Sequence, residues 1–185
     1  DEVGLMITRV EDDGTLRFDS VGGIDRRVLM GKRVYVGPHR IPAVIGSKPI
    51  HLTTKEERRS VPKMTELYLD MGAENREAAE KLVELGDVAV FDPECVEFGS
   101  GLLKAKAIDD RVGCAVMLEL LKEELPMDCT FAFSTQEEVG TRGAFAYAFS
   151  VHPEIALVVE GTTASDIPGT PEHMKVCAPG LGPVI

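Results

Sequence analysis

Residues 101–124 read GLLKAKAIDDRVGCAVMLELLKEE, and this stretch decides the class of fold that the sequence predicts. Its first part, GLLKAKAID, is typical of a strand, and its second part, RVGCAVMLELLKEE, is typical of an amphipathic helix. The alternation continues with a strand at 128–135, a helix at 141–151 and a strand at 154–161. This rhythm predicts an α/β sheet with crossover helices. The helix at 111–124 should turn four apolar side chains inward, namely Val112, Ala115, Val116 and Leu120.

The sequence before residue 101 has a different texture, with short strands separated by turns. GLMITRV and TLRFDSV flank EDDGT, which is a hairpin signal. Further strands are expected at KRVYVG, IPAVIG, TELYLDMG and DVAVF, and a single helix at residues 74–85. Residues 48–62 are polar and charged without a clear period, which favours a solvated loop or mobile flap over a binding element. A strand-rich insert therefore precedes part of an α/β domain.

Composition and charge exclude several classes of partner. The formal net charge is −11, which argues against nucleic acid and against an anionic membrane surface. The sequence has no apolar run of about 20 residues and no signal peptide, so we expect no membrane association. The four cysteines lack C-x-x-C spacing and are expected to be small buried residues in a reducing compartment. A cytoplasmic location follows from these features.

Acidic residues follow three successive predicted strands. Asp109 and Asp110 come after the first strand, Glu137 and Glu138 after the second, and Glu160 ends the third. In an open α/β sheet, ligands bind beyond the carboxyl ends of the strands. The sequence therefore places these carboxylates at one edge of the sheet.

Each of these carboxylates also has an ordinary interpretation. Asp109 or Asp110 would suit the N-cap of the following helix, and Glu160 could be a loop carboxylate. The two adjacent glutamates are harder to explain, because clustered carboxylates are costly unless a cation or a shared proton offsets their charge. The nearby cations are only Arg111 and Arg142. A divalent metal centre, with one metal or two, explains the pattern better.

Such a centre suggests a hydrolytic reaction. Two metal ions bridged by a carboxylate can hold and acidify a water molecule. Another carboxylate that does not bind metal must take the proton from that water and pass it to a leaving amine. Two adjacent glutamates suit this division, because one can coordinate while its neighbour faces the substrate.

Five motifs in order resemble the glutamyl and deblocking aminopeptidases, a family of tetrahedral-aminopeptidase-like dinuclear metallopeptidases. The motifs are DEVGLM (1–6), SVGGID (20–25), KAIDDRVGC (106–114), QEEVGTRGA (136–144) and EGTTASDIPG (160–169). The resemblance implies a phosphorylase/hydrolase-like mixed-sheet catalytic domain, formed by residues 1–10 and 99–185 and incomplete here. Residues 11–98 would be an inserted small β-barrel-like domain that mediates dimerisation, with dimers assembling into a homo-oligomer of twelve subunits.

The resemblance also implies a role for each acidic residue. Two divalent metal ions, zinc or cobalt, would be bound by Asp109 as the bridge, by Glu138 and by Glu160, where the family usually has Asp. Glu137 would be the general base. Asp1 would orient a histidine ligand, and Asp110 would support the centre through a cis peptide bond with Asp109.

Neither histidine ligand of the family is expected within the chain. One would precede Asp1 by two residues, and the other would lie beyond Ile185. The four histidines present are expected to be surface or loop residues: His39, His51, His152 and His173. The resemblance therefore implies a fragment that binds metal weakly and has little activity alone.

The function that follows is a metal-dependent aminopeptidase acting on the N-terminal peptide bond of short peptides. Two alternatives stay open. One is a dinuclear-metal deacylase acting on N-acyl or small amide substrates, and the other is a non-catalytic assembly or metal-binding remnant.

Overall fold

A computed structural model describes residues 2–185, which form two compact units. The first unit contains residues 2–107 and 134–152, and the second contains residues 108–133 and 153–185. Asp1 lies outside the described residues. The first unit holds most of the regular structure, and its main feature is a closed barrel.

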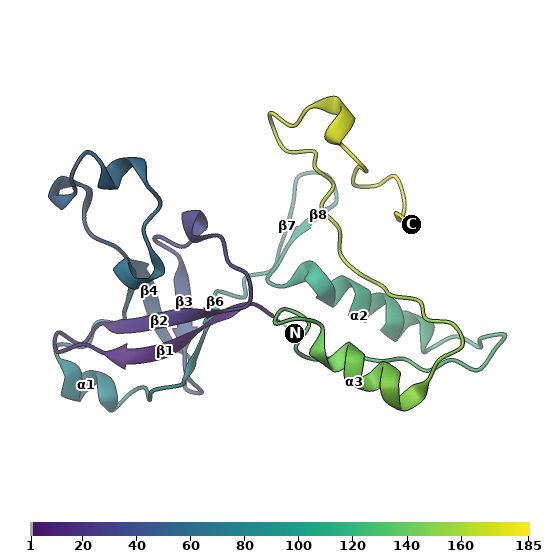
Figure 1. Cartoon of the computed structure of the whole chain (residues 1–185), viewed down its shortest axis with the longest axis horizontal. Helices are drawn as coiled ribbons and strands as arrows, with labels where there is room; N and C mark the ends of the chain where they lie inside the picture. Colours follow the sequence, from purple (N-terminus) through teal and green to yellow (C-terminus); the bar gives the residue numbers. More distant parts are fainter. Residues whose placement is uncertain (1) are drawn as a thin grey trace. The chain divides into compact units, whose positions relative to one another are not determined.

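The barrel consists of six strands in the order β1-β2-β5-β4-β3-β6, with β6 pairing back onto β1 (Figure 1). All of its pairings are antiparallel. The mixed α/β composition and the small barrel agree with the sequence prediction. The strands are β1 (Gly4–Val10), β2 (Leu16–Val21), β3 (Arg33–Val36), β4 (Ile41–Gly46), β5 (Tyr68–Asp70) and β6 (Val88–Phe91).

The turn between β1 and β2 forms as the EDDGT signal predicts. The Thr15 backbone N–H donates to Asp13 Oδ1 at 3.0 Å, and the Thr15 hydroxyl donates to the same oxygen at 2.7 Å. Across the turn, the Glu11 N–H donates to the Thr15 carbonyl at 2.8 Å. An aspartate that bonds the backbone two residues ahead closes a turn locally, so this hairpin is specified by its own residues.

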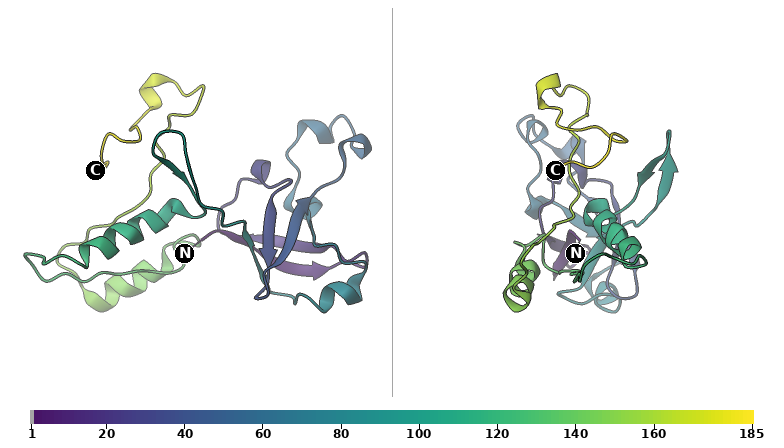
Figure 2. Two further views of the ribbon diagram at one scale, coloured as in Figure 1. Left: turned by 180° about the vertical axis from the view of Figure 1, so that it is seen from behind. Right: turned by 90° about the vertical axis from the view of Figure 1, so that its right-hand side faces the viewer.

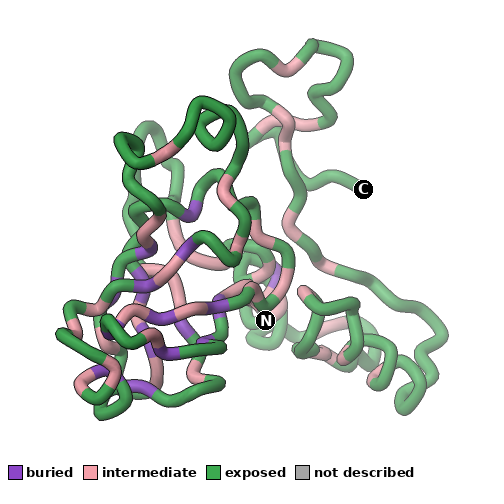
Figure 3. Tube along the Cα trace, turned by 60° about the vertical axis from the view of Figure 1, so that its left-hand side comes forward, coloured by how far each residue is buried: buried purple, intermediate pink, exposed green. Residues whose placement is uncertain are grey.

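The hydrophobic core lies inside the barrel (Figure 3). Alternate residues of β1 point inward, including Leu5 and Ile7, as the period of two in a strand requires. Residues 4–10 pair with both β2 and β6, so β1 is a strand of the barrel. The division into a catalytic domain of residues 1–10 and 99–185 and an inserted domain of residues 11–98 stays a prediction.

Helix α1 (Arg76–Glu80) is shorter than the helix predicted at 74–85. It begins two residues later than predicted, with Asn75 as its N-cap, because the Asn75 side chain accepts a hydrogen bond from the Ala78 N–H at 3.0 Å. It ends early because the chain must return to β1, where the Gly86 N–H donates to the Ile7 carbonyl at 2.9 Å.

Residues 48–62 are mostly exposed and contain two 3₁₀ turns, η2 (Ile50–Leu52) and η3 (Glu57–Arg59). The expected solvated loop agrees with this exposure. Further 3₁₀ turns are η1 (Arg26–Val28), η4 (Met64–Glu66) and η5 (Glu172–Met174).

The predicted α/β alternation is confirmed for its helices, and within residues 2–185 two of its three predicted strands do not form. Helices α2 (Ile108–Leu120) and α3 (Arg142–Val151) form, as does the short ladder of β7 (Val96–Phe98) with β8 (Leu102–Lys104) (Figure 2). Residues 128–135 and 154–161 contain no strand. A strand needs a neighbouring backbone for its hydrogen bonds, and within residues 2–185 none pairs with these two segments.

The apolar face of α2 is also exposed, contrary to the sequence prediction. Val112, Val116 and Leu120 are among the exposed large hydrophobic side chains. Their pattern is that of a helix packed on a sheet, and the sheet strands expected beside them do not form. The helix therefore keeps its amphipathic sequence without a covering partner in the described chain.

Two further expectations from the sequence concern membrane spans and the burial of the cysteines. No helix among residues 2–185 combines the length and apolar character needed to cross a membrane. The four cysteines are free thiols, but Cys95 and Cys129 are exposed and the other two are half-buried. The expectation of buried cysteines was therefore wrong.

Candidate metal centre

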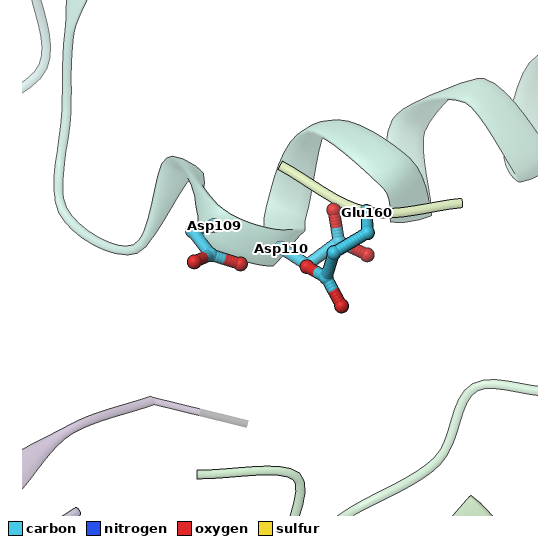
Figure 4. Close-up of side chains that lie close together, drawn as sticks. All are labelled: Asp109, Asp110 and Glu160. Atoms are coloured by element: carbon cyan, nitrogen blue, oxygen red, sulfur yellow. The ribbon is translucent and has the colours of Figure 1, made fainter. Parts of the chain in front are cut away.

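Three of the predicted site residues lie together in the second unit (Figure 4). Asp109, Asp110 and Glu160 each offer one carboxylate oxygen, and these oxygens all lie within 4.8 Å of one another. Asp109 and Asp110 stand at the start of α2, and Glu160 comes from the segment that passes beside it. The structure thus assembles acidic groups that are about 50 residues apart in the sequence.

The start of α2 explains how the two aspartates are presented. Their backbone angles are not helical, and the peptide bond between them is cis, as the resemblance implied. The Gly113 N–H donates to Asp110 Oδ1 at 3.0 Å, so Asp110 caps the regular part of the helix. The capping interpretation of the sequence is therefore confirmed for Asp110, and its carboxylate also belongs to the cluster.

Glu160 is held against the same turn. Its Oε1 accepts a hydrogen bond from the Gly161 N–H at 3.0 Å. The backbone of Gly161 lies so close to Asp109 that a Cβ built there would stand 3.4 Å from the Asp109 Cβ. This contact places the end of the 154–160 segment beside the first residue of the Asp-Asp pair.

The carboxylates of the cluster lie close enough to affect one another's protonation. Burial raises the pKa of Glu160, and a hydrogen bond with Asp109 raises it further, as do the charges of Asp110 and Asp109. Protonation of one carboxyl relieves this repulsion, and a bound cation would relieve it as well. Carboxylate oxygens are the ligands that hard divalent cations prefer, so these residues fit a divalent metal ion.

Glu137 and Glu138 lie on a tight turn before α3 in the first unit. The Glu137 carbonyl accepts hydrogen bonds from the Gly140 and Thr141 N–H groups, both at 2.9 Å. The Gly143 N–H donates to the Thr135 carbonyl at 3.0 Å, and a Cβ at Gly143 would approach that oxygen to 2.3 Å.

The two glutamates of this turn differ in their exposure to solvent. Glu137 is exposed and Glu138 is half-buried. The difference suits one glutamate that meets a substrate and another that does not. That they share a metal centre with the acidic cluster stays a prediction.

Asp1 and the four histidines are the other residues for which the sequence led to an expectation. Asp1 lies outside the described residues. The four histidines are all exposed, as expected of surface and loop positions.

Glu2 and Lys106 were not among the predicted site residues, and their side chains form an ion pair in the first unit. Glu2 lies in the motif DEVGLM and Lys106 in the motif KAIDDRVGC. Opposite charges in two motifs of the same predicted site are the sequence feature from which this ion pair could have been predicted.

Comparison with known proteins extends the resemblance to the whole chain. The family model described as M42 glutamyl aminopeptidase matches residues 1–185. A putative aminopeptidase of Acetivibrio thermocellus is 39% identical over 187 residues, which cover 100% of this chain and 54% of that protein.

Solved structures agree in fold. An aminopeptidase from the archaeon Desulfurococcus kamchatkensis superposes with a TM-score of 0.91 at 40% identity, covering 99% of this chain and 51% of that one. The Pyrococcus horikoshii TET1 peptidase, which can assemble into a tetrahedron or a large octahedral shell, gives a TM-score of 0.72 at 38% identity over 83% of this chain and 48% of its own.

The chain thus spans about half the length of the relatives that it matches. The similarity nevertheless runs through every motif quoted above, and the family model covers all 185 residues. The chain belongs to the M42 glutamyl aminopeptidase family.

Proposed function

We propose that this chain is part of a metal-dependent aminopeptidase that removes the N-terminal residue of short peptides. One observation carries the proposal. In a chain matched throughout by the M42 model, Asp109, Asp110 and Glu160 bring their carboxylate oxygens within 4.8 Å of one another. The greater length of the relatives supports the further proposal that the chain is one part of a longer protein.

We assign the metal ligands as the family resemblance implies. Asp109, Glu138 and Glu160 would hold two divalent metal ions, zinc or cobalt, with Asp109 shared between them. When bound, such ions supply Lewis acidity toward a carbonyl oxygen and acidify a water molecule. Asp110 caps α2 through the Gly113 N–H and so fixes the turn that carries Asp109.

Proton transfer falls to Glu137 in this proposal. Its side chain is exposed on a turn held by backbone hydrogen bonds to its own carbonyl. A carboxylate oxygen of Glu137 would take a proton from the attacking water and then give that proton to the nitrogen of the leaving amine. Asp1 would orient a histidine ligand from outside this chain.

Replacing Glu137 by glutamine in the full-length protein tests the assignment. E137Q keeps the size of the side chain and removes its basicity, so kcat should fall by about 100-fold or more while bound metal stays the same. D109N should instead lower the bound metal, measured by mass spectrometry of metals. E154Q, at an exposed glutamate outside the site, serves as the matched control.

The substrates used in that assay separate the competing functions. Short peptides with a free N-terminus should be cleaved, whereas the same peptides with an acetylated N-terminus should not. Preferential cleavage of the acylated peptides would point to a deacylase instead. Unchanged turnover in E137Q would show that Glu137 is not the general base.

The fold and assembly proposals rest on the same relatives. We propose that residues 128–135 and 154–161 are strands of a phosphorylase/hydrolase-like mixed sheet in the full-length protein. The shells formed by the Pyrococcus horikoshii TET1 peptidase support a homo-oligomer. We further propose, as the family resemblance implies, that the barrels pair two subunits and that these dimers build a dodecamer. Free cysteines support a cytoplasmic location.

A further inference from the structure

Glu2 and Lys106 are 104 residues apart in the sequence, yet their side chains form an ion pair within the first unit. The side chains are only 25% and 13% exposed, whereas those of the Lys104–Glu94 pair are 65% and 55% exposed. Removing one partner from a partly buried pair leaves the other charge desolvated, which is costly. The Glu2–Lys106 pair therefore ties its two segments together more firmly than a surface pair does.

The segment that contains Glu2 also touches a second part of the predicted site. Val3 lies against Gly22 in the loop after β2, and the turn carrying Glu138 lies against the same glycine. A Cβ on Gly22 would stand 2.9 Å from Val3 Cγ1 and 3.2 Å from the Glu138 Cβ, and the φ angle of Gly22 is +82°. Residues 2–3 thus contact Lys106 directly and approach Glu138 through Gly22.

We infer that Lys106 is a positioning residue for the proposed metal centre, because its ion pair with Glu2 fixes the segment that leads into Asp109. The inference rests on the proposed function. Lys106 precedes Asp109 by three residues, and Ala107 between them has a φ angle of +52°. This left-handed conformation is disfavoured for alanine, so contacts such as the Lys106 ion pair must hold the chain in it.

Cobalt binding by the full 185-residue chain tests the inference. Co²⁺ is titrated into each variant and followed by calorimetry and by its visible absorption. K106M should weaken Co²⁺ binding about tenfold, as loss of a group that orients a ligand does. K106R and the charge-reversed double variant E2K/K106E should regain most of that loss. K104M, which breaks the exposed neighbouring pair, should bind as the wild type does.

Amide hydrogen exchange of the metal-free chain gives a second readout that needs no metal. K106M should speed exchange in residues 105–112 and leave the barrel strands unchanged, and the charge-reversed variant should restore slow exchange. Wild-type Co²⁺ binding and wild-type exchange in K106M would overturn the inference, as would failure of E2K/K106E to rescue. If the wild type binds no Co²⁺ while exchange responds as expected, the carboxylates of this chain do not hold the metal by themselves. The inference about the metal centre then falls, and Lys106 is left only with the ordering of residues 105–112 that exchange measures.

Discussion

Asp110 is both the N-cap of the regular part of α2 and a member of the acidic cluster. Its Oδ1 accepts the Gly113 N–H, and its carboxylate also lies in the acidic cluster. Asparagine retains the capping oxygen without the charge, and alanine retains neither. The two substitutions therefore separate the contribution of the cap from that of the charge.

We expect D110A to destabilise the first turn of α2 by about 1 kcal/mol, the usual cost of losing an N-cap, and D110N to have almost no effect. Secondary chemical shifts of residues 111–120, measured by NMR on metal-free protein, check this. D109A is the matched control, because Asp110 keeps its cap there. Equal loss of helicity in D110A and D110N would mean that charge, and not capping, holds the turn.

The residues of the site were partly predictable. The rule that acidic groups at strand ends converge on one sheet edge led to Asp109, Asp110 and Glu160, which do lie together. The cause in the structure differs, because the strand before Glu160 does not form. The turn before α2 and the close approach of Gly161 to Asp109 bring the groups together instead. Neither contact has a sequence signal that can be read without the fold.

At the scale of elements, the weakest seam of the barrel is the one between β2 and β5. These strands pair at a single register position, Leu16 with Leu69. Arg17 reinforces the seam, since its Nη1 donates to the Thr65 and Leu67 carbonyls at 3.2 and 3.1 Å. Its Nε also donates to Glu11 Oε1 at 2.7 Å.

We therefore expect R17M to lower the free energy of unfolding by about 1–2 kcal/mol, because it leaves two carbonyls and Glu11 without this donor. Urea unfolding followed by circular dichroism measures the change. R27M is the matched control. Within residues 2–185, Arg27 has an ion pair only with the neighbouring Asp25 on the surface, so its replacement should change the free energy of unfolding much less than R17M does. Equal losses in the two variants would contradict a role for Arg17 in the seam.

The same seam has a pH dependence of known sign. Hydrogen bonds from Arg17 and Arg9 hold the pKa of Glu11 below its ordinary value of 4.5. The stabilisation is present above pH 4.5 and is lost as the pH falls through the lowered pKa of the folded state. The difference in the free energy of unfolding between wild type and R17M should therefore become smaller as the pH falls through the lowered pKa of Glu11.

Elements with local signals were predictable, and elements that need distant partners were not. The β1–β2 hairpin is closed by Asp13 within its own turn, so its sequence suffices. Residues 128–135 also have an apolar sequence but form no strand ladder. Propensity alone does not make a strand, because the free energy comes from cross-strand pairing and burial.

At the scale of the whole molecule, burial is concentrated in the barrel. All of the buried hydrophobic side chains lie between Leu5 and Ala89. Residues 121–133 and 153–185 contain no buried residue. Local stability follows buried apolar contacts, so the chain should not unfold as one cooperative unit.

Amide hydrogen exchange across the chain should show this division. We expect slow exchange in β1, β2, β3, β4 and β6 and exchange near the unfolded rate in residues 153–185. Protection of 153–185 comparable to that of the barrel would contradict it. In the full-length protein, the proposed mixed sheet should protect residues 154–161, so the two measurements together also test that proposal.

Closure of the barrel restricts how another molecule can bind it. Within residues 2–185, each of the six barrel strands has a hydrogen-bonded neighbour on both sides. An extended peptide therefore cannot add itself to this sheet by β-augmentation, which requires a strand with an open edge. A second subunit or a regulator that binds the barrel must recognise its outward side chains, so substitutions there can change partner choice without disturbing the backbone ladder.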